Sequence, residues 1–307
     1  MTMRLFPAFS GLLLALISPA SALEAIKVSD RVWALVGDLG QRSALNLGNN
    51  ATFGVVVTDA GVVLVDAGGS ANGAAEIDAE ITRLTDKPVL AVINTGGQDH
   101  RWLGNSYWKA KGARLISSKA AVADQGARFD MQWEMLRQLI GVQALNGTEP
   151  AYADETFERD LDIVIGGTRF RLRHPGRAHT PGDLIVWLPD SRIAFAGDIV
   201  FAERMLGLLP LPISSSRDWI EAFDELAALD PAMVVPGHGR PVTLAQARAD
   251  TRDYLVHLRT SVRSVLDRNG NMLAAGRIDQ SAFMRLTGAD QLAGRNAQTV
   301  FAELEFE

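Results

Sequence analysis

The sequence predicts an α+β protein in which two β-sheets pack together and helices cover their outer faces. β-Branched runs at residues 54–57 and 62–65, joined by the turn Asp59-Ala60-Gly61, indicate an antiparallel start. Alternating strands and helices follow, and hairpins return before one last strand–helix unit. Because each sheet has to bury its apolar faces, two sheets between outer helix layers satisfy this order of elements.

The first half of the chain predicts strands at residues 26–36 and 52–66. A helix is expected at 74–84, where Ile77, Ile81 and Leu84 recur at helical spacing, and a strand at 89–94. The pattern then repeats, with predicted elements at 105–111 (helix), 113–117 (strand) and 119–140 (helical).

Two hairpins are predicted next, from strands at 161–165 and 169–173 and from strands at 184–188 and 193–196. Ser216 is a candidate N-cap for a helix. A core strand at 233–235 and a long amphipathic helix at 244–265 complete the predicted core, whereas residues 281–307 give a weaker pattern. Without an internal repeat or a linker-like stretch, we expect one domain over 23–307, with a helical extension from about residue 268.

The N-terminus has the pattern of a secretory signal peptide over residues 1–22. Arg4 precedes an apolar run, and Ala20-Ser21-Ala22 is a suitable cleavage site. The alternative is an uncleaved anchor, although the apolar run is short for a membrane span. We therefore expect a periplasmic or secreted protein without stable membrane insertion after cleavage.

Composition limits the chemistry. The formal net charge of -6 argues against nucleic-acid binding, which normally needs a basic face. The chain has no cysteine, so disulfides and thiolate ligands are excluded, and any metal must bind histidine and carboxylate side chains.

Three short motifs each place one good metal ligand beside glycine or proline at the end of a strand. His179 lies in Ala178-His179-Thr180-Pro181-Gly182-Asp183, Asp198 in Ala196-Gly197-Asp198, and His238 in Pro236-Gly237-His238-Gly239. A fourth segment, residues 94–100, adds Asp99 and His100 after an apolar strand. Two or three histidines with carboxylates at one sheet edge are typical of a zinc site.

Together these motifs resemble the metallo-β-lactamase fold superfamily over residues 26–265. The match includes Val65-Asp66-Ala67-Gly68, Asn94-Thr95 and Gly104-Asn105 besides the motifs above. The signal peptide and Gly294-Arg295-Asn296-Ala297 are similar to exported quinoprotein relay system zinc metallohydrolases. The resemblance implies an αββα four-layer sandwich with the metal site at one edge, between the sheets.

The family's usual first motif, Asn-Thr-His-x-His-x-Asp-His, is altered here. If Asn94 and Asn105 fix the register, Gly96 and Gln98 replace the two histidines, and His100 and Arg101 fall at the final Asp-His. If Asp99-His100 is kept as the Asp-His pair, the histidine positions hold Thr95 and Gly97. Both registers lack the first two histidines.

The resemblance then implies one metal held by Asp99, His100, Asp198 and His238. His179 remains from the other metal position, with Gln98 as a candidate weak ligand, so a second metal is less expected. Zinc is the first choice, with iron and manganese as alternatives. Asp99 and His179 are the candidate catalytic residues, as proton acceptor and as acid or hydrogen-bond donor.

Several of these residues also have ordinary structural interpretations. Asp198 suits a helix cap, Asp66 suits a turn, and Asp66 and Asp183 are otherwise candidates to orient the ligands. Arg101 and Trp102 suit either pocket lining or packing. Residues 205–212 suit either a substrate loop or a loop that covers the core.

The leading functional hypothesis is an exported metal-dependent hydrolase for a small ester, thioester or lactam-like substrate. One alternative is a non-catalytic binding or accessory module, with a periplasmic redox enzyme as candidate partner; another is a redox-active iron site. The hydrolase is favoured because convergent buried polar groups are costly unless they are used.

Overall fold

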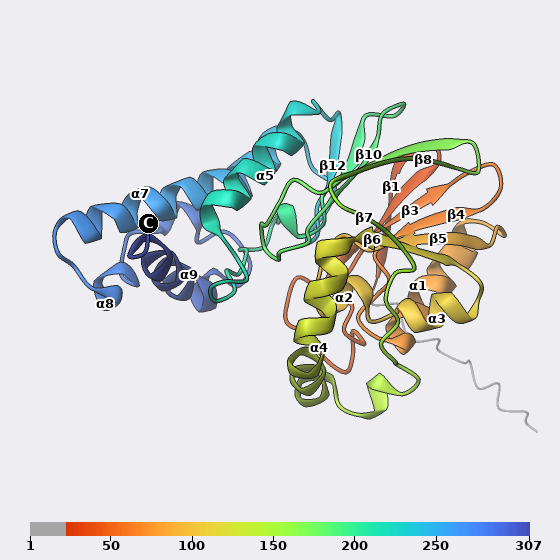
Figure 1. Cartoon of the computed structure of the whole chain (residues 1–307), viewed down its shortest axis with the longest axis horizontal. Helices are drawn as coiled ribbons and strands as arrows, with labels where there is room; N and C mark the ends of the chain where they lie inside the picture. Colours follow the sequence, from red (N-terminus) through yellow and green to blue (C-terminus); the bar gives the residue numbers. More distant parts are fainter. Residues whose placement is uncertain (1–22) are drawn as a thin grey trace, which may run out of the picture.

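The computed structural model describes residues 23–307, so the predicted signal peptide lies outside the described part. Two sheets pack face to face (Figure 1). The first has seven strands in chain order, with antiparallel pairs from β1 to β4 and parallel pairs from β4 to β7. Its strands are β1 (Glu24–Ser29), β2 (Val32–Val36), β3 (Thr52–Val57), β4 (Val62–Val65), β5 (Val89–Ile93), β6 (Arg114–Ser118) and β7 (Glu155–Phe157).

The second sheet has five strands in the order β12-β11-β10-β9-β8. All its pairs are antiparallel except β11 with β12, which run parallel. These strands are β8 (Asp160–Ile165), β9 (Thr168–Arg173), β10 (Ile185–Leu188), β11 (Ile193–Phe195) and β12 (Met233–Val235). The parallel pair matters for the site, because both strands present their carboxyl ends at the same edge of the sheet.

Helices cover the outer faces and confirm the predicted α+β, four-layer arrangement. Beside the first sheet lie α1 (Ala71–Leu84), α2 (Asp99–Trp102), α3 (Asn105–Ala110) and α4 (Lys119–Ile140). Beside the second lie α5 (Ser216–Ala228) and α7 (Asp253–Asp267), and α6 (Leu244–Ala247) contacts β12. Helices α8 (Met272–Ala275) and α9 (Ala289–Leu304) pack against α7 and lie farther from the sheets. None of the described helices has the length and apolar character needed to cross a membrane.

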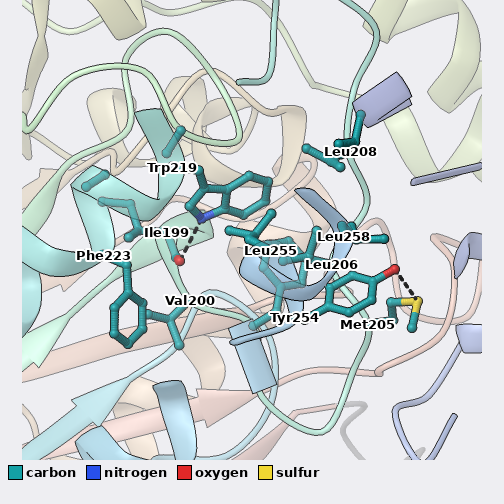
Figure 2. Close-up of a cluster of buried hydrophobic side chains, with 14 of the residues drawn as sticks. Ile199, Val200, Met205, Leu206, Leu208, Trp219, Phe223, Tyr254, Leu255 and Leu258 are labelled. Atoms are coloured by element: carbon teal, nitrogen blue, oxygen red, sulfur yellow. Dashed lines mark hydrogen bonds between the residues drawn. The ribbon is translucent and has the colours of Figure 1, made fainter. Parts of the chain in front are cut away.

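Three buried clusters separate these layers. One lies between the sheets and includes Val56, Ile93 and Phe195. A second joins the first sheet to α1 and α3. The third joins the second sheet to the C-terminal helices, and Figure 2 shows part of it. There the Trp219 indole donates to the Ile199 carbonyl at 2.8 Å, which ties α5 to the segment that carries Asp198.

Most predicted elements are present, with instructive differences. Residues 26–36 form the hairpin of β1 and β2, and Ser215, one residue before the expected Ser216, caps α5. The predicted helix at 244–265 is interrupted by a π-helical turn, η3 (Arg248–Arg252). The short α2 and β7 have too few residues to give a periodic signal. Beyond residue 268, α9 packs along α7.

Candidate active site

The site lies around a cavity of about 210 Å³ whose walls come from both halves of the molecule. Met135 of α4 lies on one side, and Leu292 and Arg295 of α9 contribute the other; the two helices belong to different halves in Figure 1. All three predicted site histidines, His100, His179 and His238, line this cavity.

Strand ends deliver the polar side chains. Asp198 lies in a short 3-10 helix after β11, and His238 follows β12, so the parallel pair brings both to one edge. His100 lies in α2, beyond the end of β5. Asn94 holds that turn in place, because its side-chain amide donates to the Arg101 carbonyl at 2.8 Å and to Asn105 Oδ1 at 3.0 Å.

One group in residues 23–307 has ligand atoms placed to hold a metal ion: His100, Asp198 and His238, all within 4.8 Å of one another. His100 Nε2 lies 3.3 Å from Asp198 Oδ2, and His238 Nε2 lies 3.2 Å from Asp198 Oδ1. All three side chains are buried. Two imidazoles and one carboxylate fit a three-ligand site for one divalent cation, with a position left for water or substrate.

Arg101 organises the base of this group. Its guanidinium donates to both oxygens of Asp198, at 3.1 and 2.5 Å, to Asp66 Oδ2 at 2.8 Å and to the Gly237 carbonyl at 2.9 Å. Burial alone would raise the pKa of Asp198, but Arg101 and His100 outweigh it and hold that pKa well below its ordinary value. Asp198 is therefore ionised. Arg101 packs within the core and does not line the cavity.

Asp66 supports the same arrangement from β4's end. Its backbone φ of 70° lies in the left-handed region, which aspartate tolerates better than most residues. Asp66 Oδ1 accepts from the Thr95 amide at 2.7 Å, and Oδ2 accepts from Arg101. It thus has both predicted roles: it holds a turn and it orients the site through Arg101.

Asp99 lies outside the three-residue group. Its Oδ1 accepts from Arg42 and from the His100 amide, while its buried Oδ2 has no hydrogen-bond partner among the described residues. Burial raises the pKa of Asp99, but Arg42 and His100 outweigh it and lower that pKa below its ordinary value. The structure therefore brings His100 to Asp198 and His238, three of the four residues of the expected ligand set, whereas Asp99 faces Arg42. A direct metal bond from Asp99 stays a prediction.

His179 contributes a second unpartnered atom. Its Nδ1 is buried without a hydrogen-bond partner in the described part of the chain, and its ring packs against Trp219 and Phe201, with centroids 5.4 and 5.8 Å away. Burial lowers the pKa of His179 to about 4, although Asp198 opposes the shift. The ring is therefore neutral at physiological pH.

Asp183, a candidate to orient the ligands, holds the turn that directly follows His179. Its Oδ2 accepts from the Thr180 amide at 2.8 Å, and the Thr180 hydroxyl contacts Oδ1. Burial raises the pKa of Asp183 to about 8, and the nearby Asp198 adds to the shift. The carboxyl group is largely protonated at neutral pH.

Polar side chains from α4 and from the turn before β10 pack against the altered loop, residues 94–100. A β-carbon on Gly96 would lie 2.5 Å from Asp183 Oδ1, and one on Gly97 would lie 1.8 Å from Asp124 Oδ2. Asp124 pairs with Arg128, which also donates to Gln98 Oε1 at 3.3 Å. Gln98 thus lines the cavity but is engaged by Arg128. A larger residue at position 96 or 97 would require Asp183 or Asp124 to move.

Sequence reasoning missed two arginines. Arg42 Nη2 lies 2.8 Å from His100 Nδ1, and Arg204 Nη1 lies 3.1 Å from His238 Nδ1. No carboxylate among residues 23–307 lies within ion-pair distance of Arg204. Burial, reinforced by Arg42, lowers the pKa of Arg204 to about 10. Neither arginine belongs to a motif, so only the folded chain reveals them.

The 205–212 stretch covers the core and also reaches the cavity, and its role as a substrate loop stays a prediction. Met205 and Leu206 are fully buried in the cluster beside the second sheet, whereas Leu208 and Leu209 line the cavity. Trp102, the other open case, belongs to a separate buried cluster with Leu136 and Ile140. It therefore packs and does not line the pocket.

Curated relatives resemble the chain over about three fifths of its length. A linear primary-alkylsulfatase from Pseudomonas sp. (strain ATCC 19151) is 24% identical over 233 residues, 64% of this chain and 44% of that protein. The chain therefore spans less than half the length of that relative. A metallo-beta-lactamase type 2 from Elizabethkingia meningoseptica is 25% identical over 191 residues, 62% of this chain and 68% of that protein.

Solved structures share the fold. A metallo-beta-lactamase from Pontibacter korlensis aligns with a TM-score of 0.60 at 22% identity, over 76% of this chain and 99% of that one. A variant of a sec-alkyl sulfatase aligns with a TM-score of 0.74 at 15% identity, over 92% of this chain and 50% of that one. The family model described as metallo-beta-lactamase superfamily matches residues 48–238, which include every residue of the metal-capable group. The chain belongs to the metallo-beta-lactamase superfamily.

Proposed function

We propose that this protein is an exported hydrolase that holds one metal ion on His100, Asp198 and His238 and cleaves a small ester, thioester or lactam-like substrate. The carrying observation is that these three ligand atoms lie within 4.8 Å of one another beside a cavity. The hydrolase-type relatives of the superfamily support the general reaction class. Zinc is the first candidate metal, because its usual ligands include imidazole and carboxylate.

When bound, such an ion supplies a Lewis acid that activates water at neutral pH and polarises a substrate oxygen. The protein's own residues position the reaction. Arg101 fixes both oxygens of Asp198 and so its orientation. His179 is neutral and lines the cavity, so we propose it as a hydrogen-bond partner for a substrate oxygen. The unpartnered Oδ2 of Asp99 is a candidate proton acceptor.

The lining of the cavity supports a small substrate with an apolar part. Leu208, Leu209, Leu292 and Met135 supply an apolar wall, and Arg204 and Arg295 supply positive charge. About 210 Å³ is below the usual range of drug-sized sites, which favours a small molecule. One of the relatives is named for alkyl sulfates and another for β-lactams, so both bond types belong in a first substrate screen.

Export is proposed from the N-terminal pattern at residues 1–22. A periplasmic location would also make a periplasmic redox enzyme available as a partner. If the intact mass of the protein from the periplasmic fraction corresponds to a chain that starts at Leu23, export is supported. Retention of residues 1–22 in the cytoplasmic fraction would contradict it.

The deciding experiment is elemental analysis of the purified protein with a matched variant. We expect about one equivalent of metal in the wild type and its loss in His238→Ala, because that variant removes one of three ligands. His257→Ala is the control, since His257 bonds the Asp279 carbonyl in a different region. Ester, lactam and alkyl sulfate hydrolysis should fall with metal content. A protein that binds no metal even with added zinc would overturn the hydrolase.

One observation favours a second candidate, a non-catalytic binding module. The carboxylate of Asp198 already accepts from Arg101 and lies against both histidines, so the polar network is closed by its own side chains. Under this alternative, His238→Ala would leave the protein's binding function intact.

A further inference from the structure

The structure assigns a second role to the arginines at the site, which rests on the proposed metal site. We infer that Arg42 and Arg204 hold His100 and His238 in the tautomer that opposes metal binding, and that an oxyanion entering the cavity releases Arg204. Metal loading and anion binding would then favour each other.

The argument starts from hydrogen-bond direction. A guanidinium can only donate, so an imidazole nitrogen that bonds to it must carry a lone pair. Arg42 Nη2 lies 2.8 Å from His100 Nδ1, and Arg204 Nη1 lies 3.1 Å from His238 Nδ1. In each neutral ring the proton therefore resides on Nε2. Both Nε2 atoms face Asp198, at 3.3 and 3.2 Å, where that proton is donated to the carboxylate.

Metal binding needs the opposite tautomer. A histidine that binds a metal through Nε2 carries its proton on Nδ1 and usually donates it to a carboxylate, carbonyl or water. With the arginines in place, an Nδ1–H group would point at another N–H donor. The arginines thus stabilise the metal-free site and weaken its affinity for a cation.

An acceptor for an Nδ1 proton of His100 lies beside the ring. Asp99 Oδ1 lies 3.2 Å from His100 Nδ1, close enough to accept the ring proton once Arg42 turns away. Arg42 now donates to both Asp99 Oδ1 and His100 Nδ1. Asp99 is therefore a positioning residue: by accepting the Nδ1 proton it would leave His100 Nε2 free to bind the metal.

Arg204 is the arginine that is available to hydrogen-bond a ligand in the cavity. It lines the cavity, and no carboxylate within residues 23–307 lies within 4.0 Å of it, unlike Arg42, Arg101 and Arg128, which all have such partners. A sulfate, phosphate or carboxylate group in the cavity would accept its donors in place of His238 Nδ1. The ligand class is therefore an oxyanion, free or carried by an organic molecule.

Zinc titration of the metal-free protein tests the coupling, with sodium sulfate as the probe and sodium chloride at equal ionic strength as the reference. We expect sulfate to tighten zinc binding to the wild type. Arg204→Gln should tighten it by about 10–100-fold without sulfate, the range over which outer partners of metal-binding histidines act, and should remove the sulfate effect. Arg295→Gln is the matched control, because Arg295 adds positive charge to the cavity but does not hydrogen-bond either imidazole.

Imidazole ¹⁵N chemical shifts give a readout that needs no metal. We expect Nε2–H for His238 in the metal-free wild type and a shift towards Nδ1–H in Arg204→Gln. Nδ1–H in the wild type would overturn the inference, as would equal zinc affinity in wild type and Arg204→Gln. If neither protein binds zinc but the ¹⁵N shifts agree with expectation, the arginine effect on the tautomer stands, whereas the proposed function and the metal coupling both fail.

Discussion

At the scale of single residues, charge pairing decides what the site can do. Asp198 is ionised and Asp183 is protonated at neutral pH, although both side chains are fully buried. The difference lies in their partners, since Asp198 faces Arg101 and Asp183 faces only hydrogen-bond donors of Thr180. Identical side chains thus acquire opposite protonation states from their neighbours.

Asp183→Asn should change how stability depends on pH. The folded protein keeps the Asp183 proton up to about pH 8, whereas the unfolded chain loses it near 3.8. Folding then binds a proton between those values, so stability falls as pH rises, by about 1.4 kcal/mol per pH unit. Urea unfolding of the metal-free protein from pH 6.5 to 8 should show this fall in wild type relative to Asp183→Asn, which mimics the neutral acid.

The window above pH 6.5 avoids an opposing effect. His179, with its pKa lowered from 6.5 to about 4, makes stability rise with pH between those values and contributes no slope above them. Parallel stability profiles for wild type and variant from pH 6.5 to 8 would mean that Asp183 is already ionised.

Arg101→Met should be among the most damaging single changes. It leaves Asp66 and Asp198 buried without their cation, and breaking such a pair typically costs about 3–5 kcal/mol. Arg240→Gln is the comparison, since the Arg240–Glu24 pair is half exposed and should contribute about 0–1 kcal/mol. Equal urea-unfolding midpoints for the two variants would show that Arg101 does not stabilise the protein by neutralising Asp66 and Asp198.

At the scale of elements, the π-helical turn η3 at the start of α7 connects that helix to the site. The Thr251 hydroxyl donates to the Phe201 carbonyl at 2.7 Å and accepts from the Phe201 amide at 3.0 Å. The Phe201 ring stacks on His238, with centroids 4.5 Å apart. A local irregularity in one helix therefore positions the segment that leads to Arg204.

Thr251→Val should lower stability by about 1–3 kcal/mol, because it leaves two buried backbone groups of Phe201 unsatisfied. Thr251→Ser keeps the hydroxyl and should retain most of the stability. Thermal or urea unfolding compares the three proteins, and a valine variant as stable as wild type would disconnect η3 from the site.

The sequence predicts elements and turns better than it predicts their partners. Strands that end in Gly or Pro motifs placed Asp198 and His238 correctly at strand ends, because local backbone chemistry determines those turns. The four-residue α2 and the three-residue β7 were not predicted, since neither is long enough to repeat an apolar pattern. Arg42 and Arg204 approach the histidines from 58 and 34 residues away, a relation that only tertiary packing creates.

At the scale of the whole molecule, the C-terminal helix is part of the structural core. Ala297, Val300 and Phe301 of α9 join the cluster beside the second sheet. Glu303 accepts from the Ser216 amide at 2.9 Å and from the Arg217 amide at 3.3 Å, which satisfies the start of α5. The last helix thus anchors the element that packs over Asp198.

We predict that α9 opens together with the core and not before it. Hydrogen exchange followed by mass spectrometry should give peptides of α9 and α7 similar opening free energies. This tests the prediction of one domain over 23–307. Exchange of α9 at a much lower free energy, with α7 and β12 still protected, would make the C-terminal extension a separate folding unit.

The two glycines of the altered loop have a consequence for how this protein can change. A β-carbon at position 96 would lie 2.5 Å from Asp183 Oδ1, and one at position 97 would lie 1.8 Å from Asp124 Oδ2, so these carboxylates would have to move to admit a larger residue. Introducing the superfamily's usual histidines would therefore also disturb the Thr180–Asp183 turn or the Asp124–Arg128 pair. We expect a second metal position to need compensating substitutions beside the loop as well as the histidines themselves.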